Sequence, residues 1–242
     1  MELGFLLLFA GTMIAFSIIN RRRQGPNIRD IHAFSRMRRA IDLAVEDGTR
    51  MHVSLGRADI TGKNSAAALV GLSMLHRITK IAADSDRPPI ATSGDGGLAL
   101  VSQDTLRSTY HTMGALSNYD LSAGRVTGLT PFSFAAGTIP VIREEAVSAN
   151  LLIGTFGNEI ALISGAGGRS VLTLAGTDNL PAQAILYATA DEQLIGEELF
   201  AGGAYVGAGP MHIASLHAQD VIRWLLIGIL IISTLGGLIA LF

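Results

Sequence analysis

The sequence predicts an α/β protein with a mainly parallel sheet and flanking helices, plus one transmembrane helix at each terminus. In the interior, short runs rich in Val, Ile and Leu alternate with longer stretches of helical periodicity. This alternation of strands and helices is typical of α/β proteins with a parallel sheet. Both ends are apolar and uncharged, and 49% of the 242 residues are hydrophobic. We therefore expect a membrane helix over residues 1–20, a cytoplasmic α/β domain over 21–220 and a second membrane helix over 221–242.

The first segment has the pattern of a retained membrane helix. Residues 3–19 contain no charge and have about the minimum length for crossing a hydrocarbon core. A cleaved signal peptide carries its positive charge before the apolar stretch, whereas here Arg21, Arg22 and Arg23 follow it. The positive-inside rule makes these three arginines the membrane-orienting residues and places the domain behind them in the cytoplasm.

The last segment has the composition of a second membrane helix. Residues 224–242 are uncharged, and Trp224 lies at the interfacial position that an aromatic anchor prefers. Arg223 lies just before this span, on the same side of the membrane, so both termini are expected outside. We expect a protein of the bacterial inner membrane, in contact with the lipid bilayer.

The elements of the first half follow from periodicity. Apolar residues recur at helical spacing in several stretches, the first of which stops at Gly48. Ser102 or Asp104 is a candidate cap for the third helix. The expected helices cover residues 31–47, 65–83 and 98–113, and the expected strands cover 50–55 and 89–92.

The second half is less regular. Residues 117–131 are turn-formers, so we expect a long surface loop or flap there. Residues 132–142 stay unassigned because Gly137 and Pro140 argue against a continuous helix. Further strands are expected at 149–153 and 170–174, and 159–164 fits either type. Pro181 is expected to open a helix through residue 190, which 192–200 extends or repeats, and Pro210 to start one that continues into the second span.

Loops after three of the predicted strands carry the candidate binding residues. The carboxyl ends of parallel strands meet at one edge of the sheet, where open α/β sheets bind ligands. Glycine permits close backbone approach to an anion, and carboxylates hold a hydroxyl-bearing ligand or a hard cation. The same residue types also form ordinary turns, so a purely structural role stays open. The candidate ligand-binding residues are Ser93, Gly94, Asp95, Asn158, Glu159, Asp178 and Asn179.

Catalytic and cofactor signatures fit poorly. Residues 56–65 resemble a P-loop, but five residues separate its two glycines, and Asn64 replaces the hydroxyl residue required after Lys63. No dinucleotide-binding glycine motif follows a strand, and the six histidines lack metal-ligating spacing, so we predict no cofactor and no metal. A formal net charge of −2 argues against nucleic acid. We assign no catalytic residues and leave open whether the protein is an enzyme.

Several long runs carry a family resemblance. They are RAIDLAVEDGTRMHVSLG, ALVGLSMLHRI, DRPPIATSGDGGLALVSQDTLR, GTDNLPAQAILYATADEQLIGEELFAGGAYVGAGP and AQDVIRW, within residues 30–224. These runs resemble an uncharacterised family of bacterial membrane proteins, a domain of unknown function found notably among Chloroflexi. The resemblance implies bacterial origin and membrane residence, and it implies no activity.

Two functions are compatible with these features. The first is a self-assembling scaffold or organiser beneath the inner membrane, because glycine- and alanine-rich residues 200–210 and Gly236–Gly237 favour close packing, and this function predicts a homo-oligomer. The alternative is a membrane-tethered domain, enzymatic or not, that binds a nucleotide or small metabolite through the candidate loops.

Overall fold

The computed structural model describes residues 2–22, 29–62, 65–207 and 209–239. The chain divides into an α/β unit, Asp30–Val206, and a terminal unit formed by Met1–Arg29 with Gly207–Phe242.

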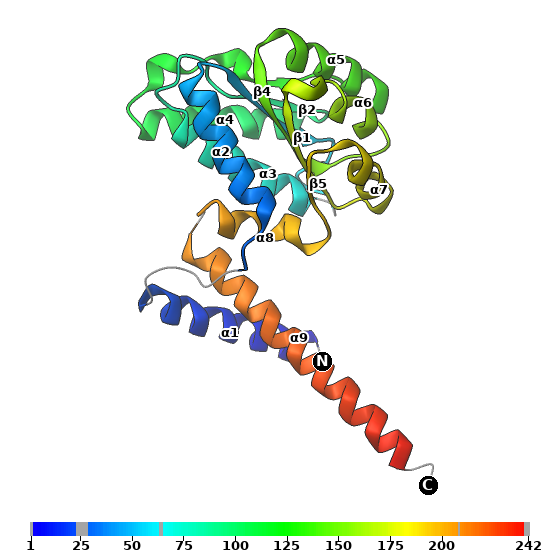
Figure 1. The fold of residues 1–242 in the computed structure, drawn as a ribbon. Helices are drawn as coiled ribbons and strands as arrows, with labels where there is room; N and C mark the ends of the chain where they lie inside the picture. The colour runs from blue at the N-terminus through cyan, green and yellow to red at the C-terminus, as the bar shows by residue number, and fades with distance from the viewer. Residues whose placement is uncertain (1, 23–28, 63–64, 208, 240–242) are drawn as a thin grey trace. The chain divides into compact units, whose positions relative to one another are not determined.

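The α/β unit is built on six parallel strands in the order β3-β2-β1-β4-β5-β6 (Figure 1). The predicted parallel sheet is confirmed. Because β4 pairs with β1 on the side away from β2, the order reverses between these two strands, as in doubly wound folds. The strands are β1 (Arg50–Gly56), β2 (Ile90–Ser93), β3 (Gly124–Val126), β4 (Val147–Thr155), β5 (Leu172–Thr177) and β6 (Glu192–Leu194).

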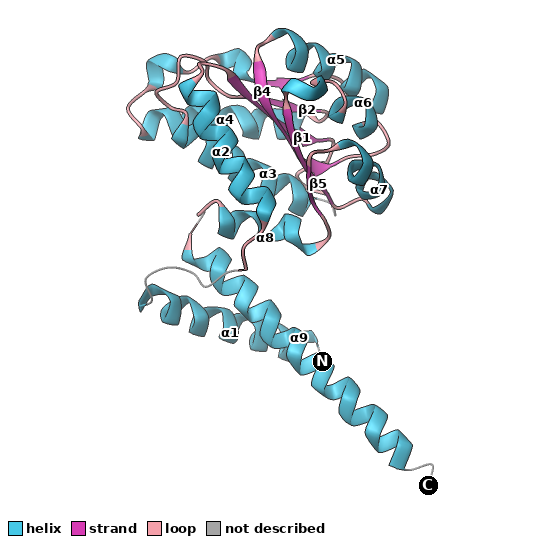
Figure 2. Cartoon of the chain, viewed as in Figure 1, coloured by secondary structure: helices cyan, strands magenta, loops and turns pink. Residues whose placement is uncertain are grey.

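Helices cover both faces of this sheet (Figure 2). One face packs against α2 (His32–Glu46), α3 (Ser65–Ile81), α4 (Gly96–Thr112) and α8 (Glu197–Tyr205). The other packs against α5 (Pro131–Glu144), α6 (Ile160–Ser164) and α7 (Leu180–Thr189). Short 3₁₀ turns lie at Leu116–Asn118, Leu121–Ala123 and Gly168–Ser170. The change of face between α4 and α5 follows from the reversed strand order, since parallel crossovers are right-handed.

Most predicted elements are confirmed, with one correction at a helix cap. The expected helices at 31–47, 65–83 and 98–113 correspond to α2, α3 and α4. However, α4 is capped by Asp95, whose carboxylate accepts from Leu98 N at 2.8 Å, and not by Ser102 or Asp104. Those two side chains lie inside the helix, where the backbone amides are already bonded.

Two corrections concern the edges of the sheet. The stretch 117–131, expected as a loop, contains the edge strand β3, which is only three residues long and carries too few apolar residues to be recognised. The stretch 192–200, expected as helix, contains β6 and α8. At the start of this stretch the Asp191 carboxylate accepts from Thr173 N of β5 at 2.8 Å, which ties the chain to the edge of the sheet.

The unassigned stretch 132–142 is helical and forms most of α5. Thr130 and Ser133 form a capping box, and Pro131 occupies the first turn, where its missing N–H costs nothing. Gly137 is there for close packing, because a Cβ at this position would collide with the carbonyl of Thr127. Pro140 lies inside the helix, which continues past it to Glu144.

The α5–α7 face of the sheet carries buried polar side chains. His52 Nδ1 lies 2.7 Å from Asn150 Oδ1, and His52 Nε2 lies 2.8 Å from Thr92 Oγ1. Thr92 Oγ1 is in turn 3.2 Å from Ser54 Oγ. All four residues have no exposed surface. We call them the polar row.

Burial lowers the pKa of His52 to about 4, with a smaller lowering by the charge of Arg125 that opposes the raising effect of the bond to Asn150. Arg125 pairs in register with Thr92 and therefore lies at the end of the polar row. Its guanidinium and that of Arg50 each contact one carboxylate oxygen of Glu145 at 2.8 Å. His52 is accordingly neutral at physiological pH.

The terminal unit consists of α1 (Glu2–Arg22) and α9 (Pro210–Ile239), which pack together through the rings of Phe16 and His217, 5.5 Å apart. The predicted helix start at Pro210 is confirmed. Arg21 and Arg22 are the last residues of α1, and Arg23 lies outside the described residues.

The prediction of a span at each terminus is corrected. Among the described residues, only the helix at Met211–Gly236 is long and apolar enough to cross a membrane. The apolar part described in α1 runs from Leu6 to Ile19 and rises about 21 Å, whereas the hydrocarbon core is about 30 Å thick. The composition of α1 resembled that of a span, but its described apolar length falls short.

Candidate functional site

The reversal of strand order marks the place where a doubly wound sheet holds its ligands. That place is the crevice outside the carboxyl ends of β1 and β4. The chain leaves β1 at Arg57 and leaves β4 through the loop that leads to Glu159. These two residues are the centre of the candidate site.

Arg57 reaches across the end of the sheet. Its Nη1 lies 3.7 Å from Glu159 Oε1, and its Nη2 donates to the carbonyl of Leu129 at 3.3 Å. Its Nε is buried and has no hydrogen-bond partner among the described residues. A guanidinium has five N–H donors, so these contacts leave most of its bonding capacity unused.

Gly94 makes room for this arginine. A Cβ at Gly94 would collide with Cγ of Arg57, so the arginine stem lies directly on the glycine at the end of β2. The same Cβ would lie 3.2 Å from the carbonyl of Gly128. The loops after β1, β2 and β3 thus pack against one another, and Arg57 extends from them toward β4.

Glu159 supplies the negative charge on the other side of the crevice. Its side chain is only 2% exposed, and its Oε1 accepts from the backbone N–H of Gly157 at 3.0 Å. A buried carboxylate is costly unless it is paired, and the cation that faces it is Arg57 at the long distance of 3.7 Å. A closer anion would therefore compete with Glu159 for the guanidinium.

The loop after β5 adds a second carboxylate. Asp178 Oδ1 is buried and has no hydrogen-bond partner among the described residues. Next to it, Asn179 caps α7 by accepting from Ala182 N at 3.5 Å. Thr177 Oγ1 accepts from the backbone N–H of Phe156 at 3.2 Å and so ties the β5 loop to the β4 loop.

The predicted residues therefore divide into three groups. Gly94 and Glu159 contact Arg57 at the reversal point. Ser93 and Asp95 bond within their own loop, since Ser93 Oγ donates to the carbonyl of Asp95 at 2.8 Å and Asp95 caps α4. The remaining three lie after β4 and β5, with Asn158 exposed, Asp178 carrying the unpartnered oxygen and Asn179 capping α7.

Sequence reasoning missed Arg57. Its signal is a cation that follows a predicted strand, in a loop whose sequence otherwise resembles a P-loop. Lys63 and Asn64, on which that test depended, lie outside the described residues.

Apolar side chains surround the same edge. Leu129, Phe132 and Leu180 are 68%, 76% and 75% exposed, and each follows the carboxyl end of a strand. Large apolar side chains gathered at one edge indicate a contact surface for a ligand or partner. In the described part of the chain, no three His, Cys, Asp or Glu side chains form a group that could hold a metal ion.

A family match covers residues 1–242 and is described as a domain of unknown function, DUF6754. The chain belongs to this family. The resemblance to a family of unknown function is thereby confirmed, whereas bacterial origin stays a prediction. No curated protein and no solved structure matches the chain.

Proposed function

We propose that this DUF6754 protein is a membrane-tethered domain that binds a small anionic metabolite, with Arg57 as its anion-binding group. The observation that carries this proposal is the guanidinium of Arg57, which lies at the strand-order reversal with one buried N–H unpartnered and its ion pair at 3.7 Å. Arginine binds carboxylate and phosphate through two parallel hydrogen bonds, and neither of its present contacts has that geometry.

The surroundings support a ligand with an apolar part as well as a charge. Leu129 offers its carbonyl to Arg57 and its exposed side chain to the same edge. The unpartnered oxygen of Asp178 would accept from a ligand hydroxyl. A nucleotide or a hydroxylated carboxylic acid combines these features.

A thermal-shift experiment on the full chain in detergent tests this proposal. Nucleotides, small hydroxy acids and inorganic phosphate serve as probes, because a ligand that binds only the folded state raises the melting temperature. We expect at least one probe to raise the Tm of the wild type, with the shift lost in Arg57→Gln. Arg107→Gln removes an exposed arginine of α4 and is the matched control. A flat panel, or an equal shift in Arg57→Gln, would refute the proposal.

For the membrane, we propose that α9 anchors the protein in a bacterial inner membrane with the α/β unit in the cytoplasm and the C-terminus outside. Arg223, the cation at the start of the uncharged stretch 224–242, supports this orientation. The chain contains no cysteine, so a single introduced thiol reports its own location. We expect Ser122→Cys, on the surface of the α/β unit, to react with an impermeant maleimide only in permeabilised cells. Labelling in intact cells would reverse the orientation.

The second candidate function is a self-assembling scaffold. It is favoured by exposed apolar side chains on both terminal helices, among them Leu6, Ile18 and Ile232, and by Gly228, where a Cβ would meet no atom within 4 Å. Small residues let helices approach closely in a membrane. We expect native mass spectrometry of the full chain from mild detergent to give a homo-oligomer. A monomer under these conditions would exclude the scaffold and leave the binding domain.

A further inference from the structure

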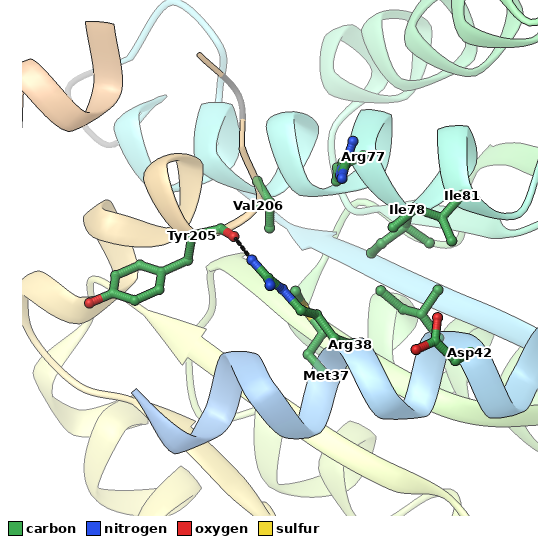
Figure 3. A pocket seen from close by; sticks show the side chains of 9 residues that line it. Met37, Arg38, Asp42, Arg77, Ile78, Ile81, Tyr205 and Val206 are labelled. Atoms are coloured by element: carbon green, nitrogen blue, oxygen red, sulfur yellow. Dashed lines mark hydrogen bonds between the residues drawn. The ribbon is translucent and has the colours of Figure 1, made fainter. Parts of the chain in front are cut away.

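A pocket lies on the α2–α3 side of the α/β unit, against the end of α8 (Figure 3). Its volume is about 210 Å³. Met37 and Ile41 of α2 and Ile78 of α3 line it and are almost fully buried, and Ile81, which is 40% exposed, lies at its margin. The floor of the pocket is therefore apolar.

Two arginines from facing helices line the same pocket. Arg38 of α2 points toward α8 and donates from Nη2 to the carbonyl of Tyr205 at 2.8 Å (Figure 3). Arg77 of α3 has no hydrogen bond or ion pair within the described residues. One carboxylate, Asp42, is the remaining charged group, and it forms no ion pair with either arginine in the described structure. The lining carries one net positive charge.

This pocket is separate from the reversal-point edge. Arg77 lies about 18 Å along α3 from Ser65, the residue at which that helix begins after the β1 loop. Its walls are α2, α3 and the end of α8, and none of the loops around Arg57 contributes to it. A ligand here does not depend on the function proposed for Arg57.

We propose that this pocket binds an amphiphilic organic anion, a carboxylate or phosphate head on a small apolar body. The head contacts Arg77 and the free donors of Arg38, because a charge-assisted bond to arginine is among the strongest polar contacts that a protein offers. The apolar body covers Met37, Ile41 and Ile81. Most small-molecule sites combine an apolar lining with a few placed polar groups in this way.

The position of the pocket gives binding a structural consequence. Tyr205 and Val206 form one wall, and Val206 is the last residue of the α/β unit before the chain passes to the terminal unit. Tyr205 is already stacked on Phe34 of α2, with ring centroids 4.5 Å apart. A ligand against this wall adds contacts that hold Tyr205 and Val206 against α2.

Titration calorimetry on the full chain in nanodiscs of neutral lipid tests the pocket. The probes are benzoate and phenyl phosphate, with benzyl alcohol and inorganic phosphate as the apolar-only and charge-only controls. We expect at least one of the two organic anions to bind more tightly than either control. Arg77→Gln is expected to weaken that binding about tenfold or more, the loss of one charge-assisted contact.

The controls make each outcome decisive. Arg77 has no partner to lose among the described residues, so Arg77→Gln is expected to fold like the wild type, which an unchanged Tm without ligand verifies. Arg107→Gln, at an exposed position of α4 outside both sites, is expected to keep wild-type affinity for the probes. Absence of binding by both organic anions, or equal affinity in Arg77→Gln, overturns the proposal.

A second arm distinguishes two sources of the same chemistry. In nanodiscs that contain phosphatidic acid, a lipid ligand competes with phenyl phosphate and lowers its apparent affinity in the wild type, which assigns the pocket to an acidic lipid. Unchanged affinity assigns it to a soluble metabolite. Both results require the Arg77-dependent binding of the first arm.

Discussion

The two faces of the central sheet are equally buried but differ in chemistry. The face under α2, α3, α4 and α8 presents apolar side chains, such as Val53, Leu55 and Ile153. On the same strands, the α5–α7 face presents the polar row. In β1 the two kinds of residue alternate, with Val53 and Leu55 on one side and His52 and Ser54 on the other.

The difference shows that alternation along a strand need not separate inside from outside. In half-exposed sheets, the polar positions meet water. Here they meet one another, and each hydrogen bond replaces one that water made in the unfolded chain. The apolar face is stabilised by the burial and close packing of its side chains. The polar face is stabilised by hydrogen bonds, which depend on the distances and angles between their partners. Substitutions on the two faces are expected to fail for different reasons.

The largest effect is expected on the apolar face. Ile153 has no exposed surface, and Ile153→Ala leaves a cavity that a close-packed core fills only in part. We expect a loss of about 4 kcal/mol in the free energy of unfolding. Urea unfolding of the full chain in detergent, followed by far-UV circular dichroism, measures it.

The exposed Leu43→Ala on α2 is the control for that substitution and is expected to change little. A cost for Ile153→Ala no greater than that of Leu43→Ala would mean that the apolar face is loosely packed, and the contrast between the faces would fail.

The polar face is expected to respond to pH. Above pH 6.5, the ordinary pKa of histidine, His52 is neutral in both the folded and the unfolded chain. Between 6.5 and about 4 the unfolded chain takes up a proton that the folded chain refuses, so stability falls as the pH falls. The change from pH 7 to pH 5 is expected to cost about 2 kcal/mol.

His52→Gln is expected to remove this part of the pH dependence, even though it lowers stability at pH 7. His111→Gln, at an exposed position of α4, is expected to keep it. The same slope in wild type and His52→Gln would show that His52 does not titrate abnormally.

The smallest effect is expected at the rim of the polar face. Glu145 is partly exposed and accepts from Arg50 and Arg125 through different oxygens, so Glu145→Gln keeps an uncharged acceptor for one arginine and turns an amide N–H toward the other. We expect a loss of about 1 kcal/mol, reduced at high salt because these charges are screened. The neighbouring exposed Glu144→Gln is the control. A loss of stability that does not depend on salt concentration would show that the Glu145 ion pairs are shielded from solvent, like the buried core.

Much of the fold was predictable because its central strands show either alternation or short apolar runs, and they lie between regular helices. β1, β2 and β4 were placed close to their observed bounds. The edge strands β3 and β6 were missed, since three residues carry no usable periodicity. α5 was missed because Gly137 and Pro140 are local helix breakers, while the packing of Gly137 against Thr127 depends on tertiary structure.

The candidate site was predictable as an edge but not as a set of contacts. Sequence alone placed Gly94 and Glu159 after strands of one sheet. It could not show that β1 lies between β2 and β4, because strand order is a long-range property. Without that order, nothing in the sequence brings Arg57, after β1, next to Glu159, after β4. The partner of Glu159 therefore emerged only from the structure.

The brevity of the outermost strands has a consequence for how copies of this chain meet. β3 and β6 offer only three residues each to a neighbour. So few free backbone groups make a poor template for a shared ladder between molecules. We therefore expect any higher-order array of this protein to be held by contacts between side chains or between the terminal helices α1 and α9. Its subunits should then dissociate without breaking backbone hydrogen bonds between strands.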